Sequence, residues 1–431
     1  MAHKIHCAAD WHTRPGLPFL VPPSVSKTSR YRILARLVSA KQGGSIAKAT
    51  HLKWIPEPIV QIHTIPTPAA LIEIDKLRKN CDAMLEHVHA LGSRLRPHMK
   101  TLKSVEAARL AVDPRHGGIA VATLNEARYF FEGGFQDICC AVCLAPEKFE
   151  LAARLIAAGA HLSFFVDSVA LANAVVAHGA RFSLWIEIDC GENRTGVEAD
   201  DPALLEIAGI LREGGQTLIG VATHAGHSYA CRSIEDIRAV AERERLVAVR
   251  AANRLRAGGF SIPHVSVGST PTTVHAVCAD GITEFRAGVY MAGDLVQSVL
   301  GSLALNRVAF SVLSSIISMQ RERHQIVVDS GGLALSKDRG TMATAHDYGY
   351  GLVTDLGGQA AFGDLIIADV HQEHGEIRNV PTHVFDQMEI GSKVRILPNH
   401  VCMTAAMYDR LHVVNSATQS VVDIWQKTNG W

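Results

Sequence analysis

From residue 60 onward, the chain alternates short runs of β-branched and aliphatic residues with stretches whose apolar residues recur at helical spacing. This alternation is typical of βα units, in which helices join parallel strands. Nine runs fit strands, at residues 69–74, 94–98, 119–123, 137–142, 162–166, 183–189, 218–224, 264–268 and 284–290. Because eight parallel strands close a barrel, we predict an α/β fold with a (β/α)8 TIM-type barrel and one strand left over.

The helical spacing fades after about residue 298. Short apolar runs at 325–328, 365–370 and 393–397 are separated by Gly, Asp and Pro, which is typical of antiparallel strands. The chain has 431 residues, 48% of them hydrophobic, so it is long enough for two domains with large cores. We therefore predict a C-terminal, mainly antiparallel β domain after the barrel.

The N-terminal segment differs from the rest in composition. Residues 1–56 hold several Lys and Arg, many Ser and Pro, and Asp10 as their one acidic residue. A disordered tail, a presequence or a start codon placed too far upstream would each look like this. We expect residues 1–60 to be a basic, poorly ordered extension without an assigned function.

Charge and cysteine content exclude some classes of protein. The net charge is zero and no basic stripe follows the N-terminal segment, which argues against a nucleic-acid partner. No apolar run approaches the ~20 residues of a transmembrane helix, so we expect no membrane partner. Nine cysteines without a small-domain framework fit reduced thiols in a cytoplasmic enzyme. For the pair Cys140 and Cys143, buried core cysteines are the favoured interpretation over a redox or zinc pair.

The carboxyl ends of barrel strands face the active site, so these ends predict its chemistry. At the first of them, Arg96-Pro97-His98-Met99-Lys100 ends a strand with a lysine, where a Schiff base would form. A solvated surface lysine is the alternative. Later ends carry an arginine in a glycine-flanked loop, a segment rich in polar rings and a turn of small residues that could cradle a phosphate: Arg194, His224 with Tyr229, and Gly268-Ser269-Thr270.

Each of these features has an ordinary reading when taken alone, as a surface salt bridge or a simple turn. Together, a lysine, a late phosphate loop, an arginine and aromatic rings on one barrel face describe a site for pyridoxal 5'-phosphate. That cofactor needs an amine for its aldehyde, donors for its phosphate and groups that hold its ring.

Five ordered motifs resemble those of a known family from about residue 62 to the C-terminus: Arg96-Pro97-His98-x-Lys100-Thr-x-Lys103, Asp189-Cys-Gly-x-x-Arg194-Thr-Gly, Gly268-Ser269-Thr270, Arg286-x-Gly288-x-Tyr290 with Asp294, and Leu397-Pro398-Asn399-His400-Val401-Cys402. The chain resembles the D-serine dehydratase and D-threonine aldolase family. These are fold-type III pyridoxal phosphate enzymes related to alanine racemase.

The resemblance implies roles for single residues. Lys100 would hold the cofactor covalently, and Gly268, Ser269 and Thr270 would bind its phosphate. Arg194 would face the ring hydroxyl, with His224 and Tyr229 beside the ring. Leu102 departs from the family pattern, which usually has a histidine there.

The resemblance also implies an arrangement of domains. The family's first strand joins the C-terminal β domain, so the barrel would span 76–297 and the β domain 61–75 with 298–431. The family's sites usually lie between two subunits, which implies a homodimer.

His400-Val401-Cys402 distinguishes members within the family. On an extended strand, side chains at i and i+2 point to the same side, so the imidazole and the thiolate could coordinate one divalent ion. A core cysteine beside a turn histidine is the ordinary reading. Thiolate with imidazole favours zinc over manganese or magnesium. Dehydratases of the family resemble this His-x-Cys pattern, whereas aldolases tend to carry His-x-Asp.

Residues 371–375 correspond to a Glu-His-Gly element of the family. They form either a substrate-binding or supporting segment or a solvated turn.

These parts predict a lyase that removes water from a D-configured β-hydroxy amino acid of the D-serine or D-3-hydroxyaspartate type, giving a 2-oxo acid and ammonia. Lys100 would act as base and the metal would activate the β-hydroxyl. A D-threonine-type aldolase is the second reading, and a non-catalytic pyridoxal phosphate homeostasis protein is the third. A racemase would want a second base that the sequence does not identify.

Overall fold

Eight parallel strands form one nearly closed barrel, as predicted. The computed structural model describes residues 60–431, and the extension predicted for 1–60 lies outside them apart from Val60. The barrel strands are β2 (Arg94–Pro97), β3 (Ile119–Val121), β4 (Asp137–Cys143), β5 (His161–Val166), β6 (Ser183–Asp189), β8 (Thr217–Ala222), β9 (His264–Val267) and β10 (Glu284–Ala287). Their order is β2-β10-β9-β8-β6-β5-β4-β3, with the short β7 (Val197–Glu198) added to β6. A parallel bridge between His98 and Ala120 brings β2 back to β3.

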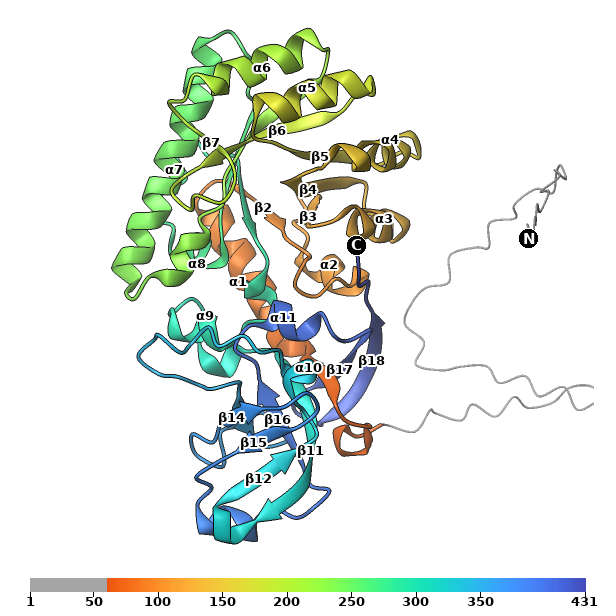
Figure 1. The fold of residues 1–431 in the computed structure, drawn as a ribbon, viewed down its shortest axis with the longest axis vertical. Coiled ribbons are helices and arrows are strands. Elements are labelled where there is room, and N and C mark those ends of the chain that lie inside the picture. Colours follow the sequence, from red (N-terminus) through yellow and green to blue (C-terminus); the bar gives the residue numbers. More distant parts are fainter. Residues whose placement is uncertain (1–59) are drawn as a thin grey trace, which may run out of the picture. The chain divides into compact units, whose positions relative to one another are not determined.

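Helices join these strands and cover the outside of the barrel (Figure 1). They are α1 (Ile74–Ala90), α2 (Val105–Ala111), α3 (Leu124–Glu132), α4 (Phe149–Ala157), α5 (Val169–His178), α6 (Ala203–Glu213), α7 (Ile234–Ala257) and α8 (Thr270–His275). Several begin at a hydroxyl residue that accepts a backbone N–H of the first turn, as Thr123, Ser168, Ser233 and Ser269 do. These side-chain caps therefore fix the residue at which each of these helices begins.

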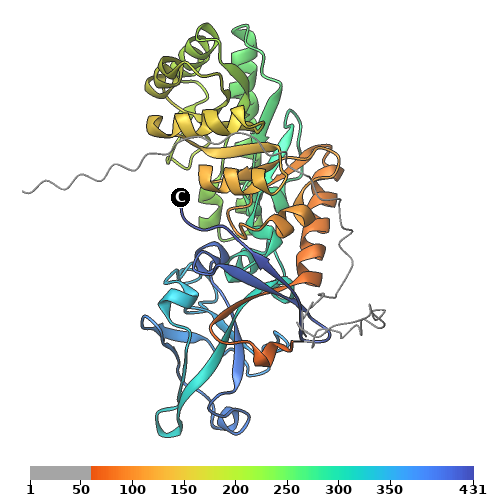
Figure 2. The same cartoon turned by 90° about the vertical axis from the view of Figure 1, so that its right-hand side faces the viewer.

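A second sheet collects the C-terminal strands and one strand from the start of the described chain. Its members are β1 (Ala69–Glu73), β11 (Phe310–Gln320), β12 (Gln325–Val328), β13 (Leu352–Thr354), β14 (Ile367–Val370), β15 (Gly375–Ile377), β16 (Lys393–Leu397), β17 (Arg410–Asn415) and β18 (Ser420–Gln426). Strand β1 pairs antiparallel with β11 and parallel with β17, and Figures 1 and 2 show it among the C-terminal strands. The mainly antiparallel sheet and the displacement of the first strand are thus confirmed.

Short helices follow strand β10 of the barrel and strands β12 and β16 of the second sheet. They are α9 (Leu295–Val299), α10 (Gly332–Leu335) and α11 (Val401–Ala405). The backbone N–H of Leu295 donates to the carbonyl of Pro398 at 3.1 Å, and that of Val401 donates to Asp294 at 3.0 Å. Because residues 60–431 form one compact unit, the division into 76–297 and 61–75 with 298–431 stays a proposal that follows the two sheets.

Two sequence predictions concern single features of residues 60–431. No helix in this range is both long and apolar enough to cross a bilayer. Cys140 is buried in the main hydrophobic core, whereas Cys143 is half-buried and packs with a separate cluster that contains Phe165 and Trp185. The two thiols therefore do not form a joint redox or zinc site.

Candidate active site

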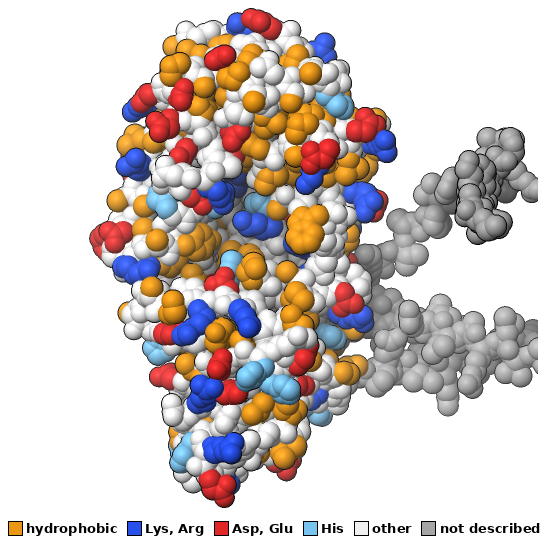
Figure 3. All heavy atoms as spheres, in the orientation of Figure 1, with side chains coloured by type: hydrophobic (Ala, Val, Ile, Leu, Met, Phe, Trp, Pro, Cys, Tyr) orange, Lys and Arg blue, Asp and Glu red, His pale blue; other side chains and the backbone are white. Residues whose placement is uncertain are grey.

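A cavity at the carboxyl ends of the barrel strands brings together all seven residues predicted to bind the cofactor. It encloses about 520 Å³ of space free of atoms, including the part open to solvent. Figure 3 shows a hollow on this face of the molecule with basic and histidine side chains around it. The seven residues that line the cavity are Lys100, Arg194, His224, Tyr229, Gly268, Ser269 and Thr270.

Lys100 reaches the cavity because β2 ends at Pro97 and the chain turns there. Its backbone N–H donates to Nδ1 of His98 at 3.3 Å. The second lysine of the motif, Lys103, pairs instead with Glu126 at 3.2 Å and does not line the cavity. Leu102 is fully buried in the core, so the position where the family usually has a histidine makes an apolar contact here. The structure thus selects Lys100 as the amine available to a cofactor.

Two histidines at the cavity are held neutral. Burial lowers the pKa of His224 to about 3, and the neighbouring charge of Lys100 adds to this effect. Burial likewise lowers the pKa of His98 well below its usual range. Nδ1 of His224 donates to the carbonyl of Gly268 at 2.9 Å, which sets its tautomer. Both rings therefore present uncharged aromatic surfaces.

The turn after β9 has a conformation that requires glycine. Gly268 has φ +125°, and a Cβ there would lie 2.7 Å from the carbonyl oxygen of Arg286. The N–H of Gly268 donates to Oε1 of Glu244 at 2.8 Å, and the N–H of Ser269 donates to Thr272 at 2.9 Å. These two backbone donors are therefore occupied within the chain. Ser269 and Thr270 line the cavity beside this turn, and the Ser269 hydroxyl also contacts the hydroxyls of Ser228 and Thr272.

Glu244 holds this turn in place from behind. The same Oε1 atom also accepts the N–H of Ala225 at 3.1 Å, so one carboxyl bridges the loops after β8 and β9. Burial raises the pKa of Glu244 to about 7. The sequence analysis did not single out this residue, because nothing in the helical pattern of α7 distinguishes it from its neighbours.

Arg286 lines the cavity although the sequence analysis assigned it no role. Its Nη2 atom donates to the carbonyl of Thr223 at 2.6 Å, and it also bonds Ser266. The guanidinium lies 5.3 Å from the centre of the Phe165 ring. The available signals were its position near the end of a barrel strand and its place in the Arg286-x-Gly288-x-Tyr290 motif. His98 and Gly288 stand in the family motifs but were likewise given no role, and the cavity residues that sequence reasoning missed are Ala141, Phe165, Glu187, Ala287 and Val289.

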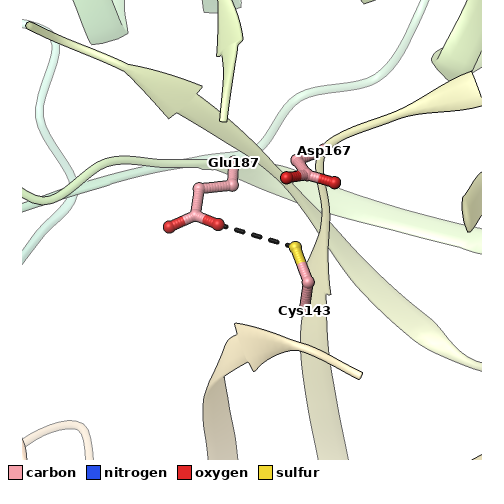
Figure 4. A group of neighbouring side chains, drawn as sticks. All are labelled: Cys143, Asp167 and Glu187. Atoms are coloured by element: carbon pink, nitrogen blue, oxygen red, sulfur yellow. Dashed lines mark hydrogen bonds between the residues drawn. The ribbon is translucent and has the colours of Figure 1, made fainter. Parts of the chain in front are cut away.

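Glu187 belongs to a cluster of three groups that can each bind a cation. Its carboxyl, the Asp167 carboxyl and the Cys143 thiol offer ligand atoms within 4.8 Å of one another and point toward one another in Figure 4. Sγ of Cys143 donates to Oε2 of Glu187 at 3.5 Å. Burial raises the pKa of both Cys143 and Glu187, which favours their protonated forms. The cluster comes from three consecutive strand ends, which sequence spacing does not bring together.

His400 and Cys402 lie together, but not on a strand. The sequence analysis placed them on an extended segment, and this was wrong: His400 is the extended residue that precedes α11, and Cys402 lies in the first turn of that helix. Nδ1 of His400 is 2.7 Å from Oδ2 of Asp338. Burial by itself lowers the pKa of His400, but Asp338 and Cys402 outweigh it and raise that pKa to about 10. The proximity of imidazole and thiol thus arises from the turn into a helix.

The candidate metal ligand Cys402 reaches the lysine segment of the barrel. Its Sγ atom lies 3.1 Å from Oγ1 of Thr101, the residue after Lys100. Burial raises the pKa of the Tyr229 phenol at the cofactor cavity, and the nearby Cys402 adds to this effect. The His400 and Cys402 pair therefore borders the cofactor cavity.

The segment 371–375 lies away from these contacts. Residues 371–374 form the exposed turn between β14 and β15, where His371 is 3.0 Å from Glu376, and the buried Gly375 begins β15. Its residues do not line the cavity described above. Of the two interpretations of this segment, the structure favours the solvated turn over a substrate-binding or supporting segment.

Comparisons with known proteins agree with this architecture. The model of the alanine racemase N-terminal domain matches residues 72–296, and that of a putative serine dehydratase domain matches residues 309–414. The chain belongs to the D-serine dehydratase family of alanine racemase-like proteins.

Relatives in this family match nearly over their whole length. D-threo-3-hydroxyaspartate dehydratase of Delftia sp. (strain HT23) is 43% identical over 85% of this chain and 98% of its own. D-serine dehydratase of Dictyostelium discoideum is 30% identical over 86% and 98%. A solved structure of a cysteine-to-alanine variant of D-threo-3-hydroxyaspartate dehydratase, in the metal-free form, has a TM-score of 0.82 at 42% identity, covering 86% of this chain and all of its own.

The residues at the cavity fit a phosphorylated aldehyde cofactor of this family. An amine, Lys100, lines the space, and two glycines in its lining let neighbouring backbones approach closely. A Cβ on Gly288 would lie 2.5 Å from the carbonyl oxygen of His98, as one on Gly268 would meet Arg286. The metal donors fit too. Asp338 engages Nδ1 of His400 and leaves Nε2 for an ion, which is the usual arrangement around a metal-binding histidine.

Proposed function

We propose that this protein is a pyridoxal phosphate- and divalent metal-dependent lyase that eliminates water from a D-configured β-hydroxy amino acid. The substrate is of the D-serine or D-3-hydroxyaspartate type, and the products are a 2-oxo acid and ammonia. The observation that carries the proposal is the 3.1 Å contact between Thr101 and Cys402, which joins the lysine segment to the His400 and Cys402 pair. The whole-length match to a D-threo-3-hydroxyaspartate dehydratase supports the same reaction.

Pyridoxal phosphate, when bound, withdraws electrons from the bonds at the α-carbon of an amino acid. In this proposal, Lys100 holds the cofactor, and the hydroxyls of Ser269 and Thr270 bind its phosphate, with Gly268 providing the turn. Arg194, His224 and Tyr229 surround the ring. Their positions around the same cavity support these assignments.

Lys100 is the proposed catalytic base. It is the lysine that lines the cavity, and its Nζ atom would accept the α-proton of the bound amino acid. The surrounding histidines are neutral at physiological pH, so they add no positive charge and are poor proton acceptors. Arg286 and Tyr229 line the same space.

His400 and Cys402 are the proposed metal ligands. A divalent ion supplies Lewis acidity toward a hydroxyl group, which turns a poor leaving group into a better one. Thiolate and imidazole together favour zinc over manganese or magnesium. The metal-free form of the cysteine-to-alanine variant of a relative supports a role for a cysteine in metal binding.

Assembly and location complete the proposal. We propose a homodimer, which the family resemblance implies, and sedimentation analysis of the purified chain tests it. The eight cysteines within residues 60–431 carry free thiols, which supports a cytoplasmic location.

The deciding experiment is a product assay. Purified enzyme loaded with cofactor and metal is incubated with D-serine, D-threonine and D-3-hydroxyaspartate, and 2-oxo acid is quantified against glycine and aldehyde. We expect 2-oxo acid and ammonia in equal amounts. Glycine with an aldehyde as the main products would replace the dehydratase by a D-threonine-type aldolase. Cofactor binding without turnover would favour a pyridoxal phosphate homeostasis protein.

A further inference from the structure

The carboxylate of Asp294 binds the beginnings of two helices at once. Its Oδ1 atom accepts the N–H of Gln297 at 2.9 Å, within α9, and its Oδ2 atom accepts the N–H of Val401 at 3.0 Å, the first residue of α11. Asp294 is 1% exposed, so both bonds lie away from solvent. One acidic group that follows the barrel strands thus holds a helix that begins 107 positions further along the chain.

Helix α11 has no side-chain cap of its own. The first N–H groups of a helix have no acceptor within it, and the side chain of the preceding residue often supplies one. His400 precedes α11 but makes no such bond, and its Nδ1 atom lies 2.7 Å from Asp338 instead. Val401 is fully buried, so its N–H needs an acceptor from the protein. Asp294 supplies that acceptor from another part of the chain.

Backbone hydrogen bonds join the same two segments in the opposite direction. The N–H of Leu295 donates to the carbonyl of Pro398 at 3.1 Å, and that of Val296 donates to the carbonyl of Asn399 at 3.3 Å. These bonds fix the chain just before α11, and the Asp294 carboxylate fixes it at the first residue of the helix. The backbone around His400 is therefore anchored at both ends to α9 and its cap.

Val401 separates the two proposed metal ligands, His400 and Cys402. Each ligand side chain has a contact of its own, with Asp338 or with Thr101, but neither contact holds the backbone between the ligands. A metal site tolerates only small errors in the positions of its ligand atoms. The backbone N–H between imidazole and thiol therefore has to be held in place, and its acceptor is a carboxylate.

We propose that Asp294 is a positioning residue of the metal site. It does not coordinate the ion, but it holds the Val401 N–H and with it the spacing of His400 and Cys402. The inference rests on the proposed metal role of this pair and assigns the group that keeps the pair in place. Asp294 stands in a family motif to which the sequence analysis gave no role. It does not line the cofactor cavity, so its loss should affect metal binding rather than cofactor binding.

The test is the affinity for zinc, measured by competition with a chromogenic chelator on the cofactor-loaded full chain. Asp294→Asn keeps the size of the side chain, but its amide group leaves one of the two N–H groups without an acceptor. We expect this variant to bind zinc about tenfold more weakly than the wild type. Asp294→Ala removes both acceptors and should weaken zinc binding about 100-fold. The visible absorption band of the bound cofactor should be unchanged in both variants.

Asp113→Asn is the matched control. The Asp113 carboxylate is also fully buried and also accepts two backbone N–H groups, from Leu95 at 3.4 Å and from Arg115 at 2.9 Å. Leu95 lies near the start of β2, whereas the proposed metal ligands border the carboxyl end of that strand. The control variant should therefore lose stability as Asp294→Asn does, but bind zinc as the wild type does.

The other outcomes separate the inference from the proposed function. Equal zinc affinity in the wild type and both Asp294 variants overturns the inference and leaves the proposed metal role standing. An equal loss of zinc affinity in Asp113→Asn, or loss of the cofactor band in Asp294→Asn, would show a general loosening of the fold and overturn the inference as well. Absence of zinc binding by the wild type would refute the proposed metal role, and the inference with it.

Discussion

The hydroxyl of Thr101 lies 3.1 Å from the thiol of Cys402, a residue 301 positions further along the chain. This contact places the residue after the cofactor lysine against a candidate metal ligand. A metal held by Cys402 and a substrate held near Lys100 would therefore be neighbours, which is the arrangement that activation of a β-hydroxyl requires.

Replacing Lys100 by alanine should abolish the covalent link to the cofactor. We expect a loss of turnover on the order of 10³-fold, because the variant lacks the proposed base. The visible absorption band of the protein-bound cofactor should disappear at the same time. Lys103→Gln is the matched control, since Lys103 pairs with Glu126 outside the cavity and its loss should leave the band in place.

Replacing Cys402 by alanine should lower the metal content of the purified protein and reduce turnover about 100-fold or more, because the Lewis acid is lost. Metal analysis and the 2-oxo acid assay measure the two effects. Cys278→Ala, which removes another partly buried thiol, should change neither. Full activity of the Cys402 variant after treatment with a chelator would contradict the metal role.

The Asp338→Asn variant should bind the metal about 10- to 100-fold more weakly, because the carboxylate 2.7 Å from Nδ1 of His400 orients the ring and increases its basicity. Competition with a chromogenic chelator measures this change. Asp369→Asn is the control, since that carboxyl pairs with Arg378 on the exposed surface. Equal metal affinity in the two variants would show that Asp338 does not position the ligand.

Truncating Glu244 should weaken cofactor binding without removing any group from the cavity wall. Glu244→Ala leaves the N–H groups of Ala225 and Gly268 without their acceptor, at a cost of about 1–3 kcal/mol each, and loosens the phosphate turn. We expect a loss of cofactor affinity of about tenfold or more, measured by equilibrium dialysis. Glu242→Ala on the same helix removes an exposed partner of Arg245 and should have no such effect.

A buried ion pair at the amino ends of the barrel strands, opposite the cofactor cavity, should make the stability of the protein depend on pH. Burial opposes ionisation of Glu284, but Arg96 at 3.1 Å and Arg94 at 2.7 Å outweigh it and lower its pKa to about 2, below the ordinary value of 4.5. The stabilisation is therefore complete above about pH 5 and is lost as the pH falls toward 2.

The Glu284→Gln variant isolates this effect. At pH 7 we expect it to lower the free energy of unfolding by about 3 kcal/mol, because it removes the carboxylate that Arg94 and the buried Arg96 share and leaves Arg96 with Asp137 alone. Denaturant unfolding at pH 7 and pH 3 measures the free energy of unfolding of both proteins. The difference between wild type and variant should be smaller at pH 3. A constant gap would mean that the carboxyl is not ionised in the folded protein. The exposed Glu389→Gln serves as control.

Much of the barrel could be predicted because each strand is specified locally. The runs at 119–123 and 183–189 became β3 and β6, since β-branched and apolar residues bounded by turn residues determine a strand within a few positions. The assignment of the first strand to the second sheet came from family resemblance. Its pairing with β11 and β17 involves residues far away in sequence, about which its own pattern contains no information.

The candidate site was predicted in part for the same reason. Carboxyl ends of parallel strands meet at one edge, so Lys100, His224 and Gly268 could be expected to converge once the strands were known. The conformation of His400 and Cys402 was mispredicted, because a short apolar segment fits a strand or a helical turn equally well and packing decides between them. Glu187 and Arg286 lie in strands whose inward and outward faces the sequence did not distinguish.

The sequence by itself determined the class of fold, the order of its parts and the identity of the groups that can do chemistry, because these depend on residue type and on spacing over a few positions. Only the tertiary structure decided which groups meet: Thr101 with Cys402, His400 with Asp338 and Glu244 with Gly268. Such contacts join residues brought together by the packing of whole helices and sheets. No local pattern encodes them.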